Sequence, residues 1–347
     1  MIMIRLKKKI IRLLGIVLLL PPVAYCQEVR FLIDTSNSMQ KTDPQHLTIP
    51  ALKLIAHLLP EKNTAGIWSF SSTVSNLVPL SPVNTKWREK AKVKANKLTF
   101  NGRNSNVGRA IESISQDWFL TPPTQERILI LLTDGQINVS NSIEANLKEK
   151  NKLLNTLIPK LKKNKIAVYA IGLSKKIDLK LLKELTFRTN GLFQFLKTSE
   201  QLQDSFYAIF NAAVNSNEVP IKNNKFNIDP AVSEVTLLLT KNKKQAFSLI
   251  SPNGKAFPLN KTNIFSTPKY TFITLKKPQY GVWEIKGLDL TQKNRVVILS
   301  DLGLSTQRFS HNYFSGEKII TFAYLTNHGK RINNKKINQN TLVTIKT

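Results

Sequence analysis

Apolar residues between positions 28 and 215 alternate between two patterns. Short continuous apolar runs are typical of strands that are buried on both faces of a sheet. Between these runs, apolar side chains recur every three or four positions, which is typical of amphipathic helices. The predicted strands span residues 29–33, 63–70, 74–80, 127–133, 166–171 and 191–195. The alternation predicts an α/β fold with a doubly wound, mostly parallel, six-stranded sheet covered by helices on both faces.

The helices between these strands have recognisable boundaries. Asp43 is placed to cap the first helix, with Pro44 as its first residue. The Lys-rich helix over residues 143–163 is expected to be interrupted near Pro159. Its lysines indicate either a solvated face or a surface that contacts an anionic partner. The other predicted helices span residues 87–98, 107–118, 178–188 and 201–213.

The pattern changes at about residue 217, where short strands follow one another without helices. They span residues 234–239, 246–250, 269–275, 281–285 and 295–299, with turn sequences such as Ser-Pro-Asn-Gly at 251–254. This pattern predicts an antiparallel, immunoglobulin-like β-sandwich over residues 217–300, with Trp283 in its core. Residues 301–347 predict a short β segment, with strands around 313–325. It either pairs with the sandwich or begins an incomplete further module.

The first 26 residues predict a signal peptide. Five cations between Arg5 and Arg12 precede an apolar stretch at 13–20, and Ala24 to Cys26 offer a cleavage site before Gln27. The apolar stretch is shorter than the roughly 20 residues that span a bilayer. Lipoprotein anchoring through Cys26 is the less favoured alternative, since bulky Tyr25 precedes it. We therefore expect an exported protein whose mature chain has no transmembrane span.

The charge and the cysteine count narrow the classes of function. The formal net charge is +29, of which +24 remains when the leader is removed. Such a chain attracts polyanions, including acidic envelope polymers and anionic membrane surfaces. The cations are spread along the sequence rather than clustered, so no specific nucleic-acid site is indicated. Cys26 is the single cysteine, which excludes disulfides and thiolate metal sites within the mature chain.

Oxygen-bearing side chains gather where two predicted strands end. Asp34, Ser36 and Ser38 follow the first strand, and Asp134 follows the apolar strand over residues 127–133. Ligands of open α/β sheets bind at the carboxyl ends of the strands. If the two strands are neighbours, as is usual in such sheets, both carboxylates face one crevice, and Ser105 adds a hydroxyl from another loop. Oxygen ligands alone suit Mg²⁺, with Ca²⁺ or Mn²⁺ as alternatives.

These motifs resemble those of the von Willebrand factor type A (VWA) domain. Asp34-Thr-Ser-Asn-Ser38 resembles its D-x-S-x-S motif, the segment from Ser105 to Ile111 its T-N-x-G-x-A-L loop, and Leu132 to Gly135 its T-D-G. The resemblance implies a Rossmann-like VWA domain over residues 27–216 with a metal-ion-dependent adhesion site (MIDAS). In that site Ser36 and Ser38 would ligate Mg²⁺ directly, Ser105 would ligate it in the ligand-competent state, and Asp34 and Asp134 would act mainly through water. Ser105 replaces the usual threonine and keeps its hydroxyl.

The resemblance implies a function without catalysis. A MIDAS leaves one coordination position open for the Asp or Glu carboxylate of a protein partner, or for an acidic polymer. The second domain resembles the β-sandwich that follows some type A domains in exported bacterial proteins, which indicates the periplasm or cell envelope. We therefore expect a metal-dependent adhesion or scaffold protein. The alternatives are a polyanion-binding envelope protein with a vestigial metal site and, less favoured, a metal-dependent hydrolase. The sequence identifies neither the partner nor the oligomeric state.

Overall fold

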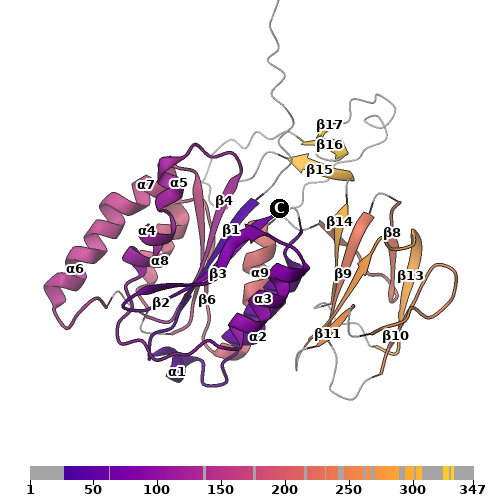
Figure 1. Cartoon of the computed structure of the whole chain (residues 1–347), viewed down its shortest axis with the longest axis horizontal. Helices are drawn as coiled ribbons and strands as arrows, with labels where there is room; N and C mark the ends of the chain where they lie inside the picture. Colours follow the sequence, from indigo (N-terminus) through magenta and orange to yellow (C-terminus); the bar gives the residue numbers. More distant parts are fainter. Residues whose placement is uncertain are drawn as a thin grey trace, which may run out of the picture.

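A six-stranded sheet forms the centre of the N-terminal domain (Figure 1). The computed structural model describes residues 27–306 except 62, 136–137, 175–176, 215–216, 231, 241–245, 261–262, 267–269, 289–293 and 301, together with 323–327 and 330–331. The strand order is β3-β2-β1-β4-β5-β6, and only β3 runs antiparallel to its neighbour. The strands are β1 (Gln27–Asp34), β2 (Thr64–Phe70), β3 (Val74–Pro82), β4 (Glu126–Thr133), β5 (Ile166–Gly172) and β6 (Phe193–Phe195).

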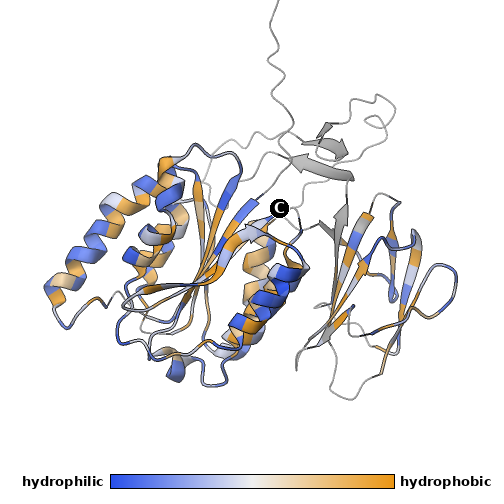
Figure 2. Ribbon diagram, in the orientation of Figure 1, coloured by the Kyte–Doolittle hydropathy of each residue, from blue (hydrophilic) through white to orange (hydrophobic). Residues whose placement is uncertain are grey.

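Helices cover both faces of this sheet because its central strands are apolar on both sides. Phe31 and Ile33 of β1 pack with helices on one face, and Leu32 packs with helices on the other. Figure 2 shows these strands as the most hydrophobic part of the domain. The first face carries α2 (Thr48–Leu58), α3 (Thr85–Ala95) and α9 (Leu202–Val214); the second carries α4 (Val107–Ile114), α5 (Gln116–Leu120), α6 (Ile143–Lys152), η1 (Leu153–Leu157), α7 (Ile158–Lys163) and α8 (Leu179–Arg188).

Three local predictions need correction. Asp43 is not the residue before a helix that starts at Pro44: α2 begins at Thr48, and Asp43 accepts hydrogen bonds from the backbone N–H groups of Leu47 and Thr48. A short helix, α1 (Met39–Thr42), precedes it and was not predicted. The expected helix over 107–118 is two helices, because the chain leaves helical geometry at Ser115. Pro159 is accommodated by the π-helical turn η1 rather than by a break.

The region after α9 consists of antiparallel sheets. A five-stranded sheet, β11-β12-β9-β14-β7, and a three-stranded sheet, β10-β13-β8, share an apolar core. Trp283 is buried in that core, as predicted, and meets Phe257 edge to face. The strands are β7 (Asn217–Val219), β8 (Lys225–Ile228), β9 (Val232–Thr240), β10 (Ser248–Ile250), β11 (Ile264–Ser266), β12 (Tyr270–Lys276), β13 (Gly281–Lys286) and β14 (Arg295–Ser300).

A further small sheet follows β14. Its antiparallel strands are β15 (Leu302–Thr306), β16 (Ala323–Asn327) and β17 (Lys330–Arg331). Most of the strand predicted around residues 313–325 lies outside the described residues, as does the predicted signal peptide. Within the part of the chain that is described, no helix has the length and apolar character needed to cross a membrane.

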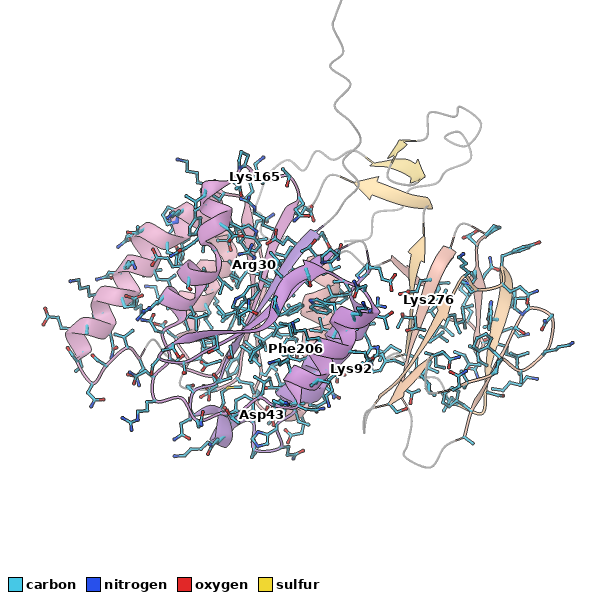
Figure 3. All side chains as sticks on the ribbon, in the orientation of Figure 1. Arg30, Asp43, Lys92, Lys165, Phe206 and Lys276 are labelled. Carbon is cyan, nitrogen blue, oxygen red and sulfur yellow. The ribbon has the colours of Figure 1, made fainter. Side chains whose placement is uncertain are left out.

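The five-stranded sheet packs against α2 and α3 of the N-terminal domain. Leu238 and Phe272 of this sheet join the apolar core beneath α2, where the Phe272 ring stacks on His57 with 5.7 Å between ring centroids. Arg88 of α3 bridges the two domains, because its guanidinium lies 3.2 Å from Glu61 and 3.5 Å from Glu234 of β9. Lys276 of β12, labelled in Figure 3, also forms an ion pair with Glu61.

We expect Arg88→Ala to destabilise the protein by about 3 kcal/mol, because it leaves Glu234 buried without its cation. Burial raises the pKa of Glu234 and Arg88 opposes that rise. A carboxyl group with a raised pKa destabilises the fold when it is charged. The loss should therefore be largest at neutral pH and shrink as the pH falls and Glu234 takes up a proton. Urea unfolding at several pH values measures it.

Lys152→Ala is the matched control for this prediction. It removes an ion pair with Glu112 that is shorter, at 2.6 Å, but much more exposed. The expected loss is below about 1 kcal/mol at every pH. If both variants lose the same free energy of unfolding, burial does not make the Arg88–Glu234 pair more important for stability than an exposed pair.

Candidate metal centre

The five predicted site residues lie together at one end of the six-stranded sheet. Asp34 ends β1, and Asp134 directly follows β4, its parallel neighbour in the sheet. Ser36 and Ser38 lie in the turn between β1 and α1, and Ser105 lies just before α4. Asp43, labelled in Figure 3, marks this end of the domain, and Lys165 marks the opposite end. The carboxyl ends of the two most buried strands therefore meet here, as the sequence predicted.

A continuous series of hydrogen bonds connects all five residues. Asp34 Oδ1 accepts the backbone N–H of Ser36 at 2.9 Å, and the hydroxyl oxygens of Ser36 and Ser38 lie 3.0 Å apart. Ser38 donates to Asp134 Oδ1 at 2.8 Å. At the other end of this series, Ser105 donates to Asp34 Oδ2 at 2.8 Å. Three loops that are far apart in the sequence thus direct their oxygen atoms at one place.

Backbone pairing fixes the loop that carries Ser105. Gly102 donates to Thr35 O at 3.0 Å and accepts from Asn37 N at 2.7 Å, so the loop lies directly against the turn between β1 and α1. A β-carbon at Gly102 would come within 2.1 Å of Ser71 Cβ, which explains why glycine is needed for this approach. On its other side, Ser105 pairs through its backbone N–H and C=O with Asn138, at 3.0 Å in both bonds.

Two threonines complete the site and were not among the predicted residues. Thr133 donates to Asp34 Oδ2 at 2.7 Å, and Thr42 donates to Asp134 Oδ2 at 2.5 Å. Thr133 belongs to the T-D-G motif, so its place at the end of a buried strand was a usable signal. Thr42 lies four residues after Ser38, and this spacing became informative only once α1 was known to be a helix.

The two carboxylates are buried next to each other. Asp34 is fully buried and Asp134 is 2% exposed. Burial raises the pKa of both groups, the charge of Asp34 further raises the pKa of Asp134, and the hydroxyl donors oppose the rise. Among the described residues, no lysine or arginine forms an ion pair with either carboxylate. The site therefore concentrates negative charge without a protein cation to balance it.

The donor set fits a hard divalent cation. Its atoms are carboxylate and hydroxyl oxygens, the ligands of Mg²⁺, Ca²⁺ and Mn²⁺. A cation would also balance the two neighbouring buried charges. Ser36 and Ser105 are buried while Ser38 is exposed, so the site opens to solvent at one side. No cluster of three or more His, Cys, Asp or Glu side chains occurs anywhere in the described part, so nothing there favours a soft metal.

Comparisons with known proteins agree with the architecture. A family model described as von Willebrand factor type A domain matches residues 28–208, slightly more than half of the chain. A second model, described as hemicentin galactose-binding domain-like, matches residues 210–298. No curated protein matches the sequence.

Solved structures give a weaker likeness. A von Willebrand factor type A protein from Catenulispora acidiphila is 14% identical with a TM-score of 0.46, covering 89% of this chain, which spans 63% of that one. Proximal thread matrix protein 1 from the mussel byssus, with a zinc-occupied MIDAS motif, is 19% identical with a TM-score of 0.41, covering 54% and 47%. BatB from Bacteroides thetaiotaomicron is 15% identical with a TM-score of 0.41, covering 55% and 99%. The family assignment is therefore carried by the sequence model.

We expect Mg²⁺ to raise the melting temperature of the wild-type protein but not that of Asp34→Asn. Mg²⁺ at a concentration of about a hundred times its Kd stabilises the folded protein by about 2.7 kcal/mol. Each kcal/mol raises the melting temperature of a domain of this size by about 2–4 °C. In EDTA the variant should melt above the wild type, because one of two adjacent buried charges is gone. Asp229→Asn, at an exposed carboxylate, is the control and should keep the Mg²⁺ response. A variant that still responds to Mg²⁺ would contradict the assignment of Asp34.

Thr42→Val should weaken Mg²⁺ binding about tenfold, because Asp134 loses the donor that holds its second oxygen. Thr42→Ser keeps the hydroxyl and should bind like the wild type. Isothermal titration calorimetry with Mg²⁺ compares the three proteins. If valine and serine behave alike, Thr42 does not position Asp134.

Proposed function

This chain belongs to the von Willebrand factor type A domain family, and from that premise we propose that it is a non-enzymatic protein that binds a partner protein through a divalent cation. One observation carries the proposal. Five side chains from three loops join in a single hydrogen-bond network around two buried carboxylates at the surface end of the sheet. The ion we favour is Mg²⁺, with Ca²⁺ and Mn²⁺ as alternatives.

Each residue of the site has a distinct task in this proposal. Ser36, Ser38 and Ser105 hold the cation through their hydroxyl oxygens. Asp34 and Asp134 supply the negative charge that keeps the cation in place and orient the three serines through the hydrogen bonds described above. When bound, the cation supplies an electrophilic position for a carboxylate oxygen of the partner. Binding would then require both the ion and an acidic side chain, which makes it selective.

A binding role accounts for the site better than catalysis does. The hydroxyl groups that donate to Asp34 and Asp134 belong to the site itself, so the two carboxylates orient the groups that would hold the cation. No histidine joins the hydrogen-bond network around them within the described part. We therefore assign the site to adhesion or scaffolding.

The proposed location is the periplasm or cell envelope, where a partner with exposed acidic residues would be met. The predicted leader supports this location. The net charge of +24 that remains without the leader adds long-range attraction to any acidic partner. The same charge supports the rival proposal, in which the protein binds polyanions or anionic membrane surfaces and the metal site is vestigial.

Binding of the full chain to an immobilised envelope extract separates the two proposals. We expect binding in Mg²⁺ that is lost in EDTA and lost in Ser36→Ala. Ser81→Ala removes a hydroxyl from β3 near the opposite end of the sheet and should bind normally. Binding that survives EDTA and Ser36→Ala but falls steeply with salt would instead favour the polyanion function.

A further inference from the structure

Helix α6 begins with a segment that projects beyond its neighbours, as Figure 1 shows. Lys150 pairs with Asp178, the residue that caps α8, at 2.5 Å. Glu149 packs against Gly108, the second residue of α4, and Lys152 pairs with Glu112 one turn later. Both neighbouring helices therefore begin level with residues 149–150. The six residues 143–148, which we call the α6 spur, extend about 9 Å past that level.

The spur exposes two large apolar side chains on one face. No residue of α6 is buried; Ile143 is 78% exposed and Leu147 is 54% exposed. The two lie four residues apart and therefore share one face of the helix. Leu179, the first residue of α8, is 39% exposed and adjoins the Asp178–Lys150 pair. Lys150 lies three residues after Leu147, so its pair with Asp178 places Leu179 on the side of α6 that carries Ile143 and Leu147.

The spur is tied to the metal centre by a short series of contacts. Ser105 pairs with Asn138 through the backbone, and Asn104 Nδ2 donates to Val139 O at 3.0 Å. Asn146, within the spur, accepts from Val139 N at 2.8 Å and donates to Ser140 O at 3.0 Å. The loop that leaves Asp134 therefore holds the spur beside the loop that carries Ser105.

The charged residues around the spur indicate which kind of partner would bind there. Lys148 on the spur and Lys180 and Lys183 on α8 are exposed, as are Arg103 and Arg109 beside Ser105. The acidic residues Asp34 and Asp134 are buried, Glu149 and Asp178 are half-buried with Asp178 paired to Lys150, and Glu144 is the exposed acid of the spur. The exposed surroundings are thus mostly cationic, which disfavours a second copy of a chain that keeps a net charge of +24 without its leader. The spur also has no aromatic residue of the kind that anchors a helix in a membrane interface.

We propose that the α6 spur and Leu179 form a second contact surface for the same partner, and that the partner is an acidic protein segment with aliphatic side chains next to the carboxylate bound at the metal. The inference rests on the proposed function, because the metal would hold one residue of the segment. The spur contributes apolar contact and lysine charge alongside it. Aliphatic contact distinguishes this partner from a purely polyanionic polymer, which would use the cations alone.

The test selects a random-peptide display library on the full chain in Mg²⁺. Selected peptides are synthesised and their Kd values measured against the wild type and the double variant Ile143→Ser/Leu147→Ser. We expect enrichment of peptides that combine Asp or Glu with Leu, Ile or Val, and binding weakened about tenfold or more in the double variant. Leu120→Ser, an 84% exposed leucine on α5 before β4, is the matched control and should bind normally.

Other outcomes overturn the inference. They are peptides that bind the wild type and the double variant alike, or no enrichment at all. Binding to phosphatidylcholine–phosphatidylglycerol vesicles that depends on Ile143 and Leu147 would assign the spur to a membrane surface instead. EDTA and Asp34→Ala separate this inference from the proposed function. If they leave peptide binding intact while the double variant weakens it, the metal-dependent function fails and the spur remains a binding surface.

Discussion

Two carboxylates buried side by side are the constraint on which the functional end of this protein depends. Parallel pairing of β1 and β4 brings Asp34 and Asp134 together, and burial raises the pKa of both. Charged carboxylates in such a place require donors or a cation. Hydroxyl groups of Ser38, Thr42, Ser105 and Thr133 supply the donors. A divalent cation would supply the remaining positive charge, and this is the physical basis of the proposed metal site.

The rest of the fold holds these groups in place. The central strands are apolar on both faces and covered by helices, which leaves their carboxyl ends as the edge where polar side chains can meet. Among the described residues, the second domain contacts α2 and α3 through Phe272 and the Arg88 ion pairs. The candidate metal centre lies at the carboxyl ends of β1 and β4 instead, so the two use different parts of the N-terminal domain.

The chemistry of binding divides into two parts of different selectivity. General positive charge attracts any acidic surface and is weakened by salt. In the proposed function, a bound cation would accept one carboxylate in one position, and the exposed Ile143 and Leu147 of the α6 spur would favour a partner with aliphatic side chains nearby. A protein with such a strongly basic sequence would gain its specificity from the second part, because the first does not distinguish one polyanion from another.

Sequence alone determined the class of fold and the order of most strands and helices, and it selected five residues that the structure places together. The fold could be predicted because a buried parallel strand needs a continuous apolar run, and Asp34 and Asp134 each lie at the end of such a run. The serines were selected by their motifs. The β-sandwich core around Trp283 followed from the same kind of pattern. Predictions of local features were wrong where contacts between residues determine them. The start of α2 depends on the hydrogen bonds that Leu47 and Thr48 donate to Asp43. The end of α4 at Ser115 has no strong signal in the sequence.

The tertiary structure decided which further groups meet, beyond the five that the motifs selected. Thr42 and Thr133 join the site because α1 and β4 bring their hydroxyls to the carboxylates, and no spacing in the sequence specifies those distances. The Arg88–Glu234 pair links residues from different domains, and the α6 spur exists because α4 and α8 begin level with its second turn. Local sequence patterns record whether a residue is buried or exposed, whereas contacts between segments depend on how whole elements pack.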